Sequence, residues 1–293
     1  MNESLTSQLS DAFGIPTCTW SQQYQKATGF FLVDEAKQAD GQISSYNTCF
    51  RFLIKSLLAT DHAYPGLKST WEYEWTEIGF WTQWKSSESS ILLCMIHDKG
   101  KLGIWNEMRK LLRDVQTIPV QAGPFVWHQL VLPIISQAFD RSVWTCRDRI
   151  RELERNRPRV SSVRPQYADM HEIARHIVHI SETLDMSINV LDSILQEIRN
   201  FEQTRASREQ DSAFEPRAAV RLLGCQKTLL QCALGRSQAL TSRLQNEINL
   251  VHCVSAINCG TMADASRHST SAQSAIVLSL PRWLELCSKT VPQ

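Results

Sequence analysis

The most constraining feature of the chain is a long seam of apolar residues whose spacing alternates mostly between three and four. The seam follows Met170 and comprises Ile173, Ile177, Ile180, Leu184, Ile188, Leu191, Leu195, Ile198 and Phe201. This spacing is typical of helices that pack lengthwise against one another. A helix of about 40 residues measures roughly 55–60 Å, because each residue adds about 1.5 Å. Such a length exceeds what a compact globule needs, so the seam predicts an antiparallel coiled-coil hairpin or a stalk.

Two further segments extend this helical half of the chain. Residues 125–157 form a helical run that Pro158 stops. A polar break over residues 206–216 separates the seam from a third helix with a similar apolar stripe. The stripe comprises Val220, Leu223, Leu230, Leu234, Leu244, Ile248 and Val251. The second half is therefore predicted to be a long antiparallel helical hairpin that leads into a stalk-like helix.

The first half of the chain mixes strand and helix signals. Residues 70–84 alternate aromatic and polar side chains, which is the period-2 pattern of a strand, and residues 90–96 form the short apolar run of a buried strand. A turn is predicted at 98–100 and a helix over 102–115. The aromatic residues of the first strand could pack in the core or form a ligand platform. The predicted fold class is α+β, predominantly helical.

These signals divide the chain into three parts. We expect a small N-terminal α/β domain over residues 1–120, a long-helix hairpin and stalk region over 121–251, and a divergent, poorly ordered tail over 252–293. The longest apolar run of the tail, residues 275–281, is far shorter than the about 20 residues that a spanning helix needs. The N-terminus has neither the positive start nor the apolar run of a signal peptide. We therefore expect a cytoplasmic protein without direct membrane insertion.

Charge and cysteine content exclude some classes of function. The 31 Lys and Arg residues balance 30 Asp and Glu residues, so no global charge indicates a nucleic-acid partner. The nine cysteines are scattered without a C-x-x-C pair. Such a set, without a secretion signal, favours reduced thiols and offers no metal-site spacing.

A histidine cluster on the seam helix is the first candidate site. His176 and His179 are three residues apart and Glu172 lies four residues before His176, so the three side chains share one helix face. Imidazole and carboxylate at this spacing can bind Zn²⁺ or another divalent ion, with His171 nearby. The alternative, which the ordinary surface pairs among these residues favour, is a polar surface between helices, with Glu182 and Asp185. No H-E-x-x-H pattern is present.

Two other polar groups lie on the predicted helices. The first contains eight arginines and three acids: Arg141, Arg147, Arg149, Arg151, Arg155, Arg157, Arg159 and Arg164, with Asp148, Glu152 and Glu154. It could contact phosphates or form a solvated, salt-bridged face. The second comprises Arg236, Arg243, Asn246, Glu247 and Asn249. These residues could fix the register between helices or coordinate a hydrated cation.

Three ordered segments carry a resemblance to a known family. They are PFVWHQLVLPIISQAFDRSVWTCRDRIRELERNR at 124–157, DMHEIARHIVHISETLDMSINVL at 169–191 and GRSQALTSRLQNEINL at 235–250. Together they resemble the CorA-like cation transporter superfamily, and more narrowly its divergent filamentous-fungal branch. The phrase WTEIGFWTQW at 75–84, followed by ILLCMIHD, is similar to the soluble domain of that branch. The resemblance covers roughly residues 70–251.

The resemblance implies a cytosolic α/β domain, a helical hairpin and a final helix that runs into the first transmembrane segment. In the family, five subunits surround a pore, and a Gly-Met-Asn motif at its outer mouth receives hydrated Mg²⁺. This sequence contains no Gly-Met-Asn triplet, and the nearest string is Gly-Thr-Met-Ala at 260–263. Both pore helices are missing. We therefore expect that the chain does not transport ions alone, and that it reaches a membrane only if a longer gene product supplies the pore helices.

Two functions follow from these features. The preferred one is a non-enzymatic, CorA-like protein related to divalent metal-ion transporters, with a role in regulation or assembly, or a truncated transporter. Its expected partners are copies of itself or full-length CorA-like relatives, and its candidate ions are Mg²⁺ and Zn²⁺. The alternative is a helical metal-dependent enzyme that uses His171, His176 and His179. The sequence shows no nucleophile elbow, phosphate loop or other catalytic motif for that alternative.

Overall fold

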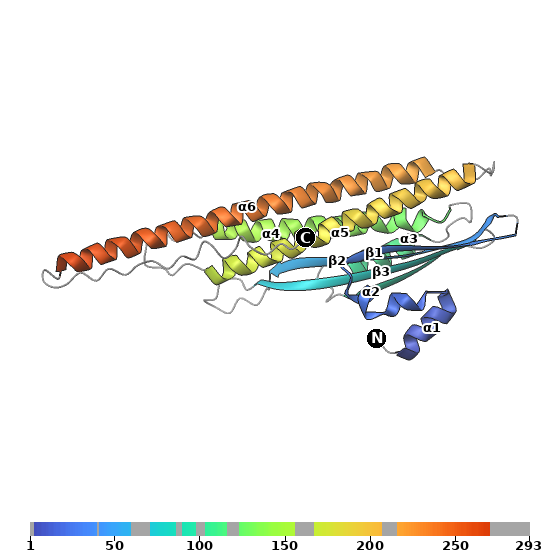
Figure 1. Ribbon diagram of the computed structural model, residues 1–293, viewed down its shortest axis with the longest axis horizontal. Coiled ribbons are helices and arrows are strands. Elements are labelled where there is room, and N and C mark those ends of the chain that lie inside the picture. The colour runs from blue at the N-terminus through green and yellow to red at the C-terminus, as the bar shows by residue number, and fades with distance from the viewer. Residues whose placement is uncertain are drawn as a thin grey trace, which may run out of the picture.

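The chain folds into an antiparallel sheet covered by long helices. The computed structural model describes residues 3–39, 41–59, 71–85, 90–97, 103–115, 123–155, 167–206 and 216–269. In Figure 1 the sheet forms one layer, helices α4 and α5 lie on it, and α6 lies across the helices on the side away from the sheet. The architecture is α+β and mostly helical, as the sequence predicts.

The sheet contains four strands in the order β1-β2-β3-β4, and each neighbouring pair is antiparallel. The strands are β1 (Gly29–Lys37), β2 (Ile43–Ala59), β3 (Trp71–Lys85) and β4 (Ile91–His97). Strands β2 and β3 are longer than their neighbours: β1 begins opposite Phe52, and β4 ends opposite Glu77. Residues 53–59 and 71–76 therefore pair only with each other among the described strands, as a two-stranded ribbon that continues from the four-stranded half.

Short helical segments cover the outer face of the four-stranded half. They are α1 (Glu3–Phe13), η1 (Thr17–Trp20) and α2 (Gln22–Lys26). Ile15, Cys49 and Trp81 form a small buried cluster beneath them. The indole N–H of Trp81 donates to the carbonyl of Phe13 over 3.1 Å. This hydrogen bond and the cluster attach the N-terminal segment to the sheet.

The helical half contains three long helices and one short one. They are α3 (Ile104–Asp114), α4 (Val126–Arg155), α5 (Tyr167–Ala206) and α6 (Pro216–Ser269). Helix α5 has 40 residues and α6 has 54, so the predicted long hairpin is present. Helices α4 and α5 both pack on β2, and α6 packs on both of them. None of the described helices is long and apolar enough to cross a membrane.

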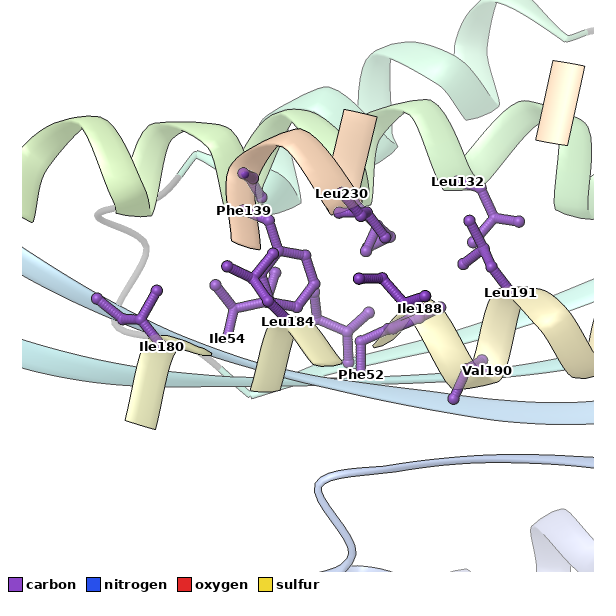
Figure 2. Packing of buried hydrophobic residues seen from close by; sticks show 14 of the residues in the cluster. Phe52, Ile54, Leu132, Phe139, Ile180, Leu184, Ile188, Val190, Leu191 and Leu230 are labelled. Atoms are coloured by element: carbon purple, nitrogen blue, oxygen red, sulfur yellow. The ribbon is translucent and has the colours of Figure 1, made fainter. Parts of the chain in front are cut away.

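The apolar seam forms the centre of the main core. All nine seam residues of α5 are buried there, together with Leu223, Leu230, Leu244 and Ile248 of α6. Figure 2 shows Leu184 and Ile188 of α5 lying among side chains from other elements. These include Phe52 and Ile54 of β2, Leu132 and Phe139 of α4, and Leu230 of α6. The heptad-like spacing therefore reports burial between a sheet and two other helices, and not a free stalk.

Most predicted elements are confirmed. The strands predicted at 70–84 and 90–96 are β3 and β4, and the helix predicted at 102–115 is α3. The predicted turn at 98–100 lies outside the described residues. Helix α6 continues past Val251 to Ser269, beyond the predicted end of the stalk-like helix. The rest of the predicted tail, 270–293, lies outside the described residues.

Candidate functional site

Helix α5 passes the edge of the sheet at the first residue of β1. A Cβ added to Gly29 would lie 2.9 Å from Cγ of Met186 and 3.2 Å from Cγ2 of Val190. The helix thus approaches the β1 backbone more closely than a side chain at this position would permit. Because β1 begins there, the part of α5 that precedes Met186 reaches the two-stranded ribbon, and it carries the predicted histidine cluster.

Lys55 of β2 lies at the centre of the contact between the ribbon and α5. Only 4% of its surface is exposed. Its Nζ lies 2.8 Å from Nδ1 of His179, and 4.5 Å and 4.8 Å from the ring centroids of Trp75 and Tyr73. Lys55 and Trp75 are cross-strand partners, so their side chains leave the ribbon on the same face. Cation–π attraction and a hydrogen bond thus replace water around the ammonium group.

The two predicted histidines complete this cluster. The ring of His176 lies 4.8 Å from that of Tyr73, and the ring of His179 lies 5.6 Å from that of Trp75. The aromatic residues of β3 pack against other parts of the chain, and a ligand platform on them stays a prediction. The even-numbered residues of β3 from Thr76 to Phe80 enter the core, whereas Tyr73 and Trp75 receive a lysine and two histidines of the same chain.

The charges of the cluster act against one another. Burial lowers the pKa of His176 to about 4, and the Lys55 ammonium acts in the same direction while Glu172 opposes it. Burial and Lys55 also lower the pKa of His179. The pKa of Lys55 is lowered by burial and by the Arg175 guanidinium. The site therefore holds two imidazoles that favour the neutral form beside a buried amine.

This geometry does not favour the predicted metal site. In the part of the chain that the structure describes, no three His, Cys, Asp or Glu side chains are grouped so as to hold a metal ion. Glu172 Oε1 lies 3.8 Å from Nε2 of His176, but Nδ1 of His179 already faces the Lys55 ammonium. A divalent cation beside that ammonium would be repelled. Binding of Mg²⁺ or Zn²⁺ by Glu172, His176 and His179 thus stays a prediction.

The structure separates the third histidine from the other two. His171 is exposed on α5, as are Glu182 and Asp185, whereas His176 is buried. The geometry thus joins His176 and His179 to the ribbon and leaves His171 on the solvent side. The alternative function as a metal-dependent enzyme loses one of its three imidazoles in this arrangement.

A second histidine site, not anticipated from the sequence, lies under the four-stranded half. His128 of α4 is fully buried, and its Nε2 lies 3.1 Å from Oγ1 of Thr48, which lies 2.6 Å from Oγ1 of Thr82. The His128 ring stacks on Phe50 at 4.6 Å. Burial lowers the pKa of His128 to about 3, so its imidazole is neutral at physiological pH. Without solvent access, this site is a polar contact within the core.

The arginine-rich groups mostly connect elements. Arg141 pairs with Glu107 of α3 at 2.7 Å, and Arg149 pairs with Glu152 at 2.8 Å. On α6, Arg236 pairs with Asp140 of α4 at 3.1 Å and Arg243 pairs with Glu154 at 2.7 Å. These ion pairs between α4 and α6 are consistent with the first of the two roles that the sequence leaves open for this group, which is to fix the register between helices. The salt-bridged face predicted for the first group is also present.

Sequence reasoning missed Lys55, although the sequence carries a signal for it. Lys55 is a single charge within the apolar run FLIKSLLA at 52–59. A lysine in such a run is either on a solvated edge or held by specific partners. Its partners come from β3 and from α5, far away in sequence, and spacing within one segment cannot identify them.

Comparison with known proteins gives distant similarities. No family model matches the chain. Notoamide biosynthesis cluster protein M' of Aspergillus versicolor is 24% identical over 200 residues, which are 63% of this chain and 42% of that protein. The chain thus spans about two fifths of the length of the curated relative that it matches.

Among solved structures, the cytoplasmic domain of ZntB from Vibrio parahaemolyticus is similar. The TM-score is 0.42 and the sequence identity 10%, over 85% of each chain. The likeness is coarse.

Proposed function

We propose that the chain is a non-enzymatic, CorA-like protein related to divalent metal-ion transporters, with a role in assembly or regulation. The observation that supports this most is the position of the three segments that resemble the CorA-like superfamily. The segments at 124–157, 169–191 and 235–250 fall on α4, α5 and α6, and these helices pack together. Motifs that come together in one bundle fit a shared architecture better than isolated matches do.

The side chains of these segments also act on one another. Within 124–157 and 235–250, Asp140 and Glu154 of α4 pair with Arg236 and Arg243 of α6. Ser181 of α5 shares a hydrogen bond of 2.8 Å with Ser237 of α6. The segments that suggest the family therefore also hold the bundle together.

Helix α6 offers a surface for the proposed assembly. Among its large apolar residues, Leu229 is 52% exposed and Leu222 is 38% exposed, one heptad apart on the side away from the core. Leu250 lies further along the helix and is 44% exposed. Apolar residues at heptad spacing on an exposed helix face favour contact with another helix. We propose copies of this chain or full-length CorA-like relatives as the partners, and the cytoplasm as the location.

Co-expression with a full-length CorA-like transporter tests this proposal. We expect the tagged chain to co-purify with the transporter and to change the rate of Mg²⁺ uptake into cells. The double substitution Leu222→Asp, Leu229→Asp should abolish both effects, because it places charges on the proposed contact. Leu5→Asp is the matched control, since Leu5 is 47% exposed on α1, away from α6. Unchanged uptake and no co-purification with the unsubstituted chain would contradict the proposal.

The state of the purified chain gives a second test. We expect weak self-association, because a coiled-coil contact of two or three leucines per helix buries little apolar area. Light scattering should show a mass that rises gradually with protein concentration. A tight pentamer at micromolar concentration would show that the chain assembles by itself, and the need for a full-length partner would then be wrong.

A further inference from the structure

Two arginines of α4 are left without partners when the ion pairs of the arginine-rich group are assigned. Arg147 pairs with Asp148, and Arg149 pairs with Glu152 and approaches Asp169 at 3.7 Å. Arg151 and Arg155 are exposed, and they have no ion pair or hydrogen bond with the described residues. The group that the sequence assigns either to a salt-bridged face or to phosphate contact therefore contains both kinds of arginine.

The unpaired arginines line an open hollow of about 370 Å³ on the surface of α4. Its lining consists of Arg151, Arg155, Asp148 and Glu152. By formal charge these four side chains cancel, but each carboxylate has one oxygen paired with an arginine outside the hollow. Asp148 accepts from Arg147, and Glu152 accepts from Arg149 and, over 3.1 Å, from the indole N–H of Trp71. Arg151 and Arg155 thus carry the two charges of the hollow that have no ion pair among the described residues.

Arg147 and Arg149, which pair with the two carboxylates, also contact aromatic rings. The guanidinium of Arg147 lies 4.2 Å from the ring of Trp144, and that of Arg149 lies 5.4 Å from the ring of Trp71. Stacking of this kind restricts a guanidinium to one orientation. Arg147 and Arg149 thus stay on Asp148 and Glu152, and the charges of Arg151 and Arg155 are not cancelled by them.

We propose that Arg151 and Arg155 form a binding site for a phosphoryl group, on a soluble phosphate compound or on a phospholipid headgroup. The two side chains are four residues apart on one helix, so their attachment points lie about 6 Å apart. A phosphoryl group carries a charge near −2 and three oxygens, and two guanidinium groups can therefore bind it at the same time. A single carboxylate would neutralise only one of them.

Binding of inorganic pyrophosphate to the full chain tests the proposal, by calorimetry at low salt. The double substitution Arg151→Gln, Arg155→Gln should weaken binding at least about tenfold, which corresponds to 1.4 kcal/mol. The matched control is Arg217→Gln, Arg221→Gln on α6. This pair has the same spacing, is also exposed, and makes no ion pair with the described residues, but it does not line the hollow. The control should bind as the unsubstituted chain does.

A third variant tests the assignment of the carboxylates. Asp148→Asn should tighten pyrophosphate binding, because it leaves the Arg147 guanidinium without its counter-charge at the rim of the hollow. If Asp148 instead neutralised the charge of Arg151, the unsubstituted chain would not bind pyrophosphate and only the Asp148→Asn variant would bind it. Binding only in the Asp148→Asn variant would therefore overturn the proposed site.

Vesicles distinguish the two sources of the phosphoryl group. Phosphatidylcholine vesicles with a minor fraction of phosphatidic acid are sedimented with the chain and with both double variants. Pyrophosphate binding without sedimentation supports a soluble ligand, and sedimentation that depends on Arg151 and Arg155 supports a headgroup. An equal loss of binding in the Arg151/Arg155 and Arg217/Arg221 double variants would show that binding depends only on the net charge of the chain. That result, or no binding to either probe, would overturn the proposal.

Discussion

The four-stranded half of the sheet and the two-stranded ribbon each place histidine against aromatic rings, with different results. In the four-stranded half, His128 stacks on Phe50 at 4.6 Å and is completely enclosed. In the ribbon, His179 contacts Trp75 and the Lys55 amine, and Tyr73 is 49% exposed. The first arrangement has neighbours on both sides of the sheet. In the second, α5 supplies the histidines, while α4 contacts the ribbon at Lys55 and Trp71.

This difference follows from strand length. Where β1 and β4 flank β2 and β3, helices and α1 cover both faces, and a buried polar group must find its partner inside, as His128 does with Thr48. Where the flanking strands end, α5 crosses the edge and adds charged and polar residues. In the enclosed half, burial lowers the pKa of His128. At the ribbon, both burial and the charge of Lys55 lower the pKa values of His176 and His179.

The largest expected change in the free energy of unfolding comes from a substitution in the four-stranded half. Phe50→Ala removes a fully buried ring that also stacks on Phe80 at 4.8 Å. We expect a loss of about 3–5 kcal/mol in the free energy of unfolding, because the cavity is closed in on all sides. Urea unfolding measures it. A loss below about 1 kcal/mol would show that the four-stranded half relaxes around the gap, and the contrast with the ribbon would fail.

The next effect is a dependence of stability on pH. Burial lowers the pKa of His128 to about 3, so the unfolded chain, with a pKa of about 6.5, binds a proton that the folded chain rejects. This contribution to stability is complete above about pH 6.5 and is lost as the pH falls toward 3. Between pH 7 and pH 5 the loss should be about 2 kcal/mol.

His128→Gln serves as the variant for this measurement, since Gln does not titrate and can still reach Thr48. The acid-induced loss of unfolding free energy should shrink by about 2 kcal/mol in this variant. An unchanged slope would mean that His128 has the same pKa in the folded and the unfolded chain, and that enclosure does not hold its imidazole neutral.

The two halves also differ in how far the sequence predicts them. The α5 seam and strand β3 follow from the periodicity of their own residues, and β4 follows from its continuous apolar run. Strand β2 was not predicted, since the run around Lys55 is buried on both faces and shows no alternation. His176 and His179 were placed correctly on one helix face. Their contact with Lys55 was not, because it joins segments more than a hundred residues apart.

A smaller effect is expected at the ribbon itself. Lys55→Met replaces a buried ammonium by an apolar side chain of similar length that can pack against Trp75 and Tyr73. We expect a gain of about 1 kcal/mol in the free energy of unfolding, because desolvation of the charge is no longer required. Chemical denaturation at pH 7 checks the sign. Destabilisation beyond about 1 kcal/mol would show that the hydrogen bond to His179 and the cation–π contacts outweigh the desolvation.

The smallest expected effect is that of metal ions on the ribbon cluster. A ligand at about 100 times its dissociation constant stabilises the folded state by roughly 2.7 kcal/mol, which would raise the melting temperature by several degrees. Mg²⁺ at millimolar concentration should shift it by less than about 1 °C, since Lys55 repels a cation and Mg²⁺ prefers oxygen ligands.

Zn²⁺ should produce at most a modest shift, because imidazole suits it better and His176 and His179 share one face of α5. That shift should disappear in the double variant His176→Ala, His179→Ala and should grow in Lys55→Met, which removes the competing ammonium. A large shift with Mg²⁺ in the unsubstituted chain would contradict both statements, since an ion would then bind despite the amine. A Zn²⁺ shift that is the same in all three proteins would place the ion elsewhere, at exposed thiols such as Cys225 or Cys232.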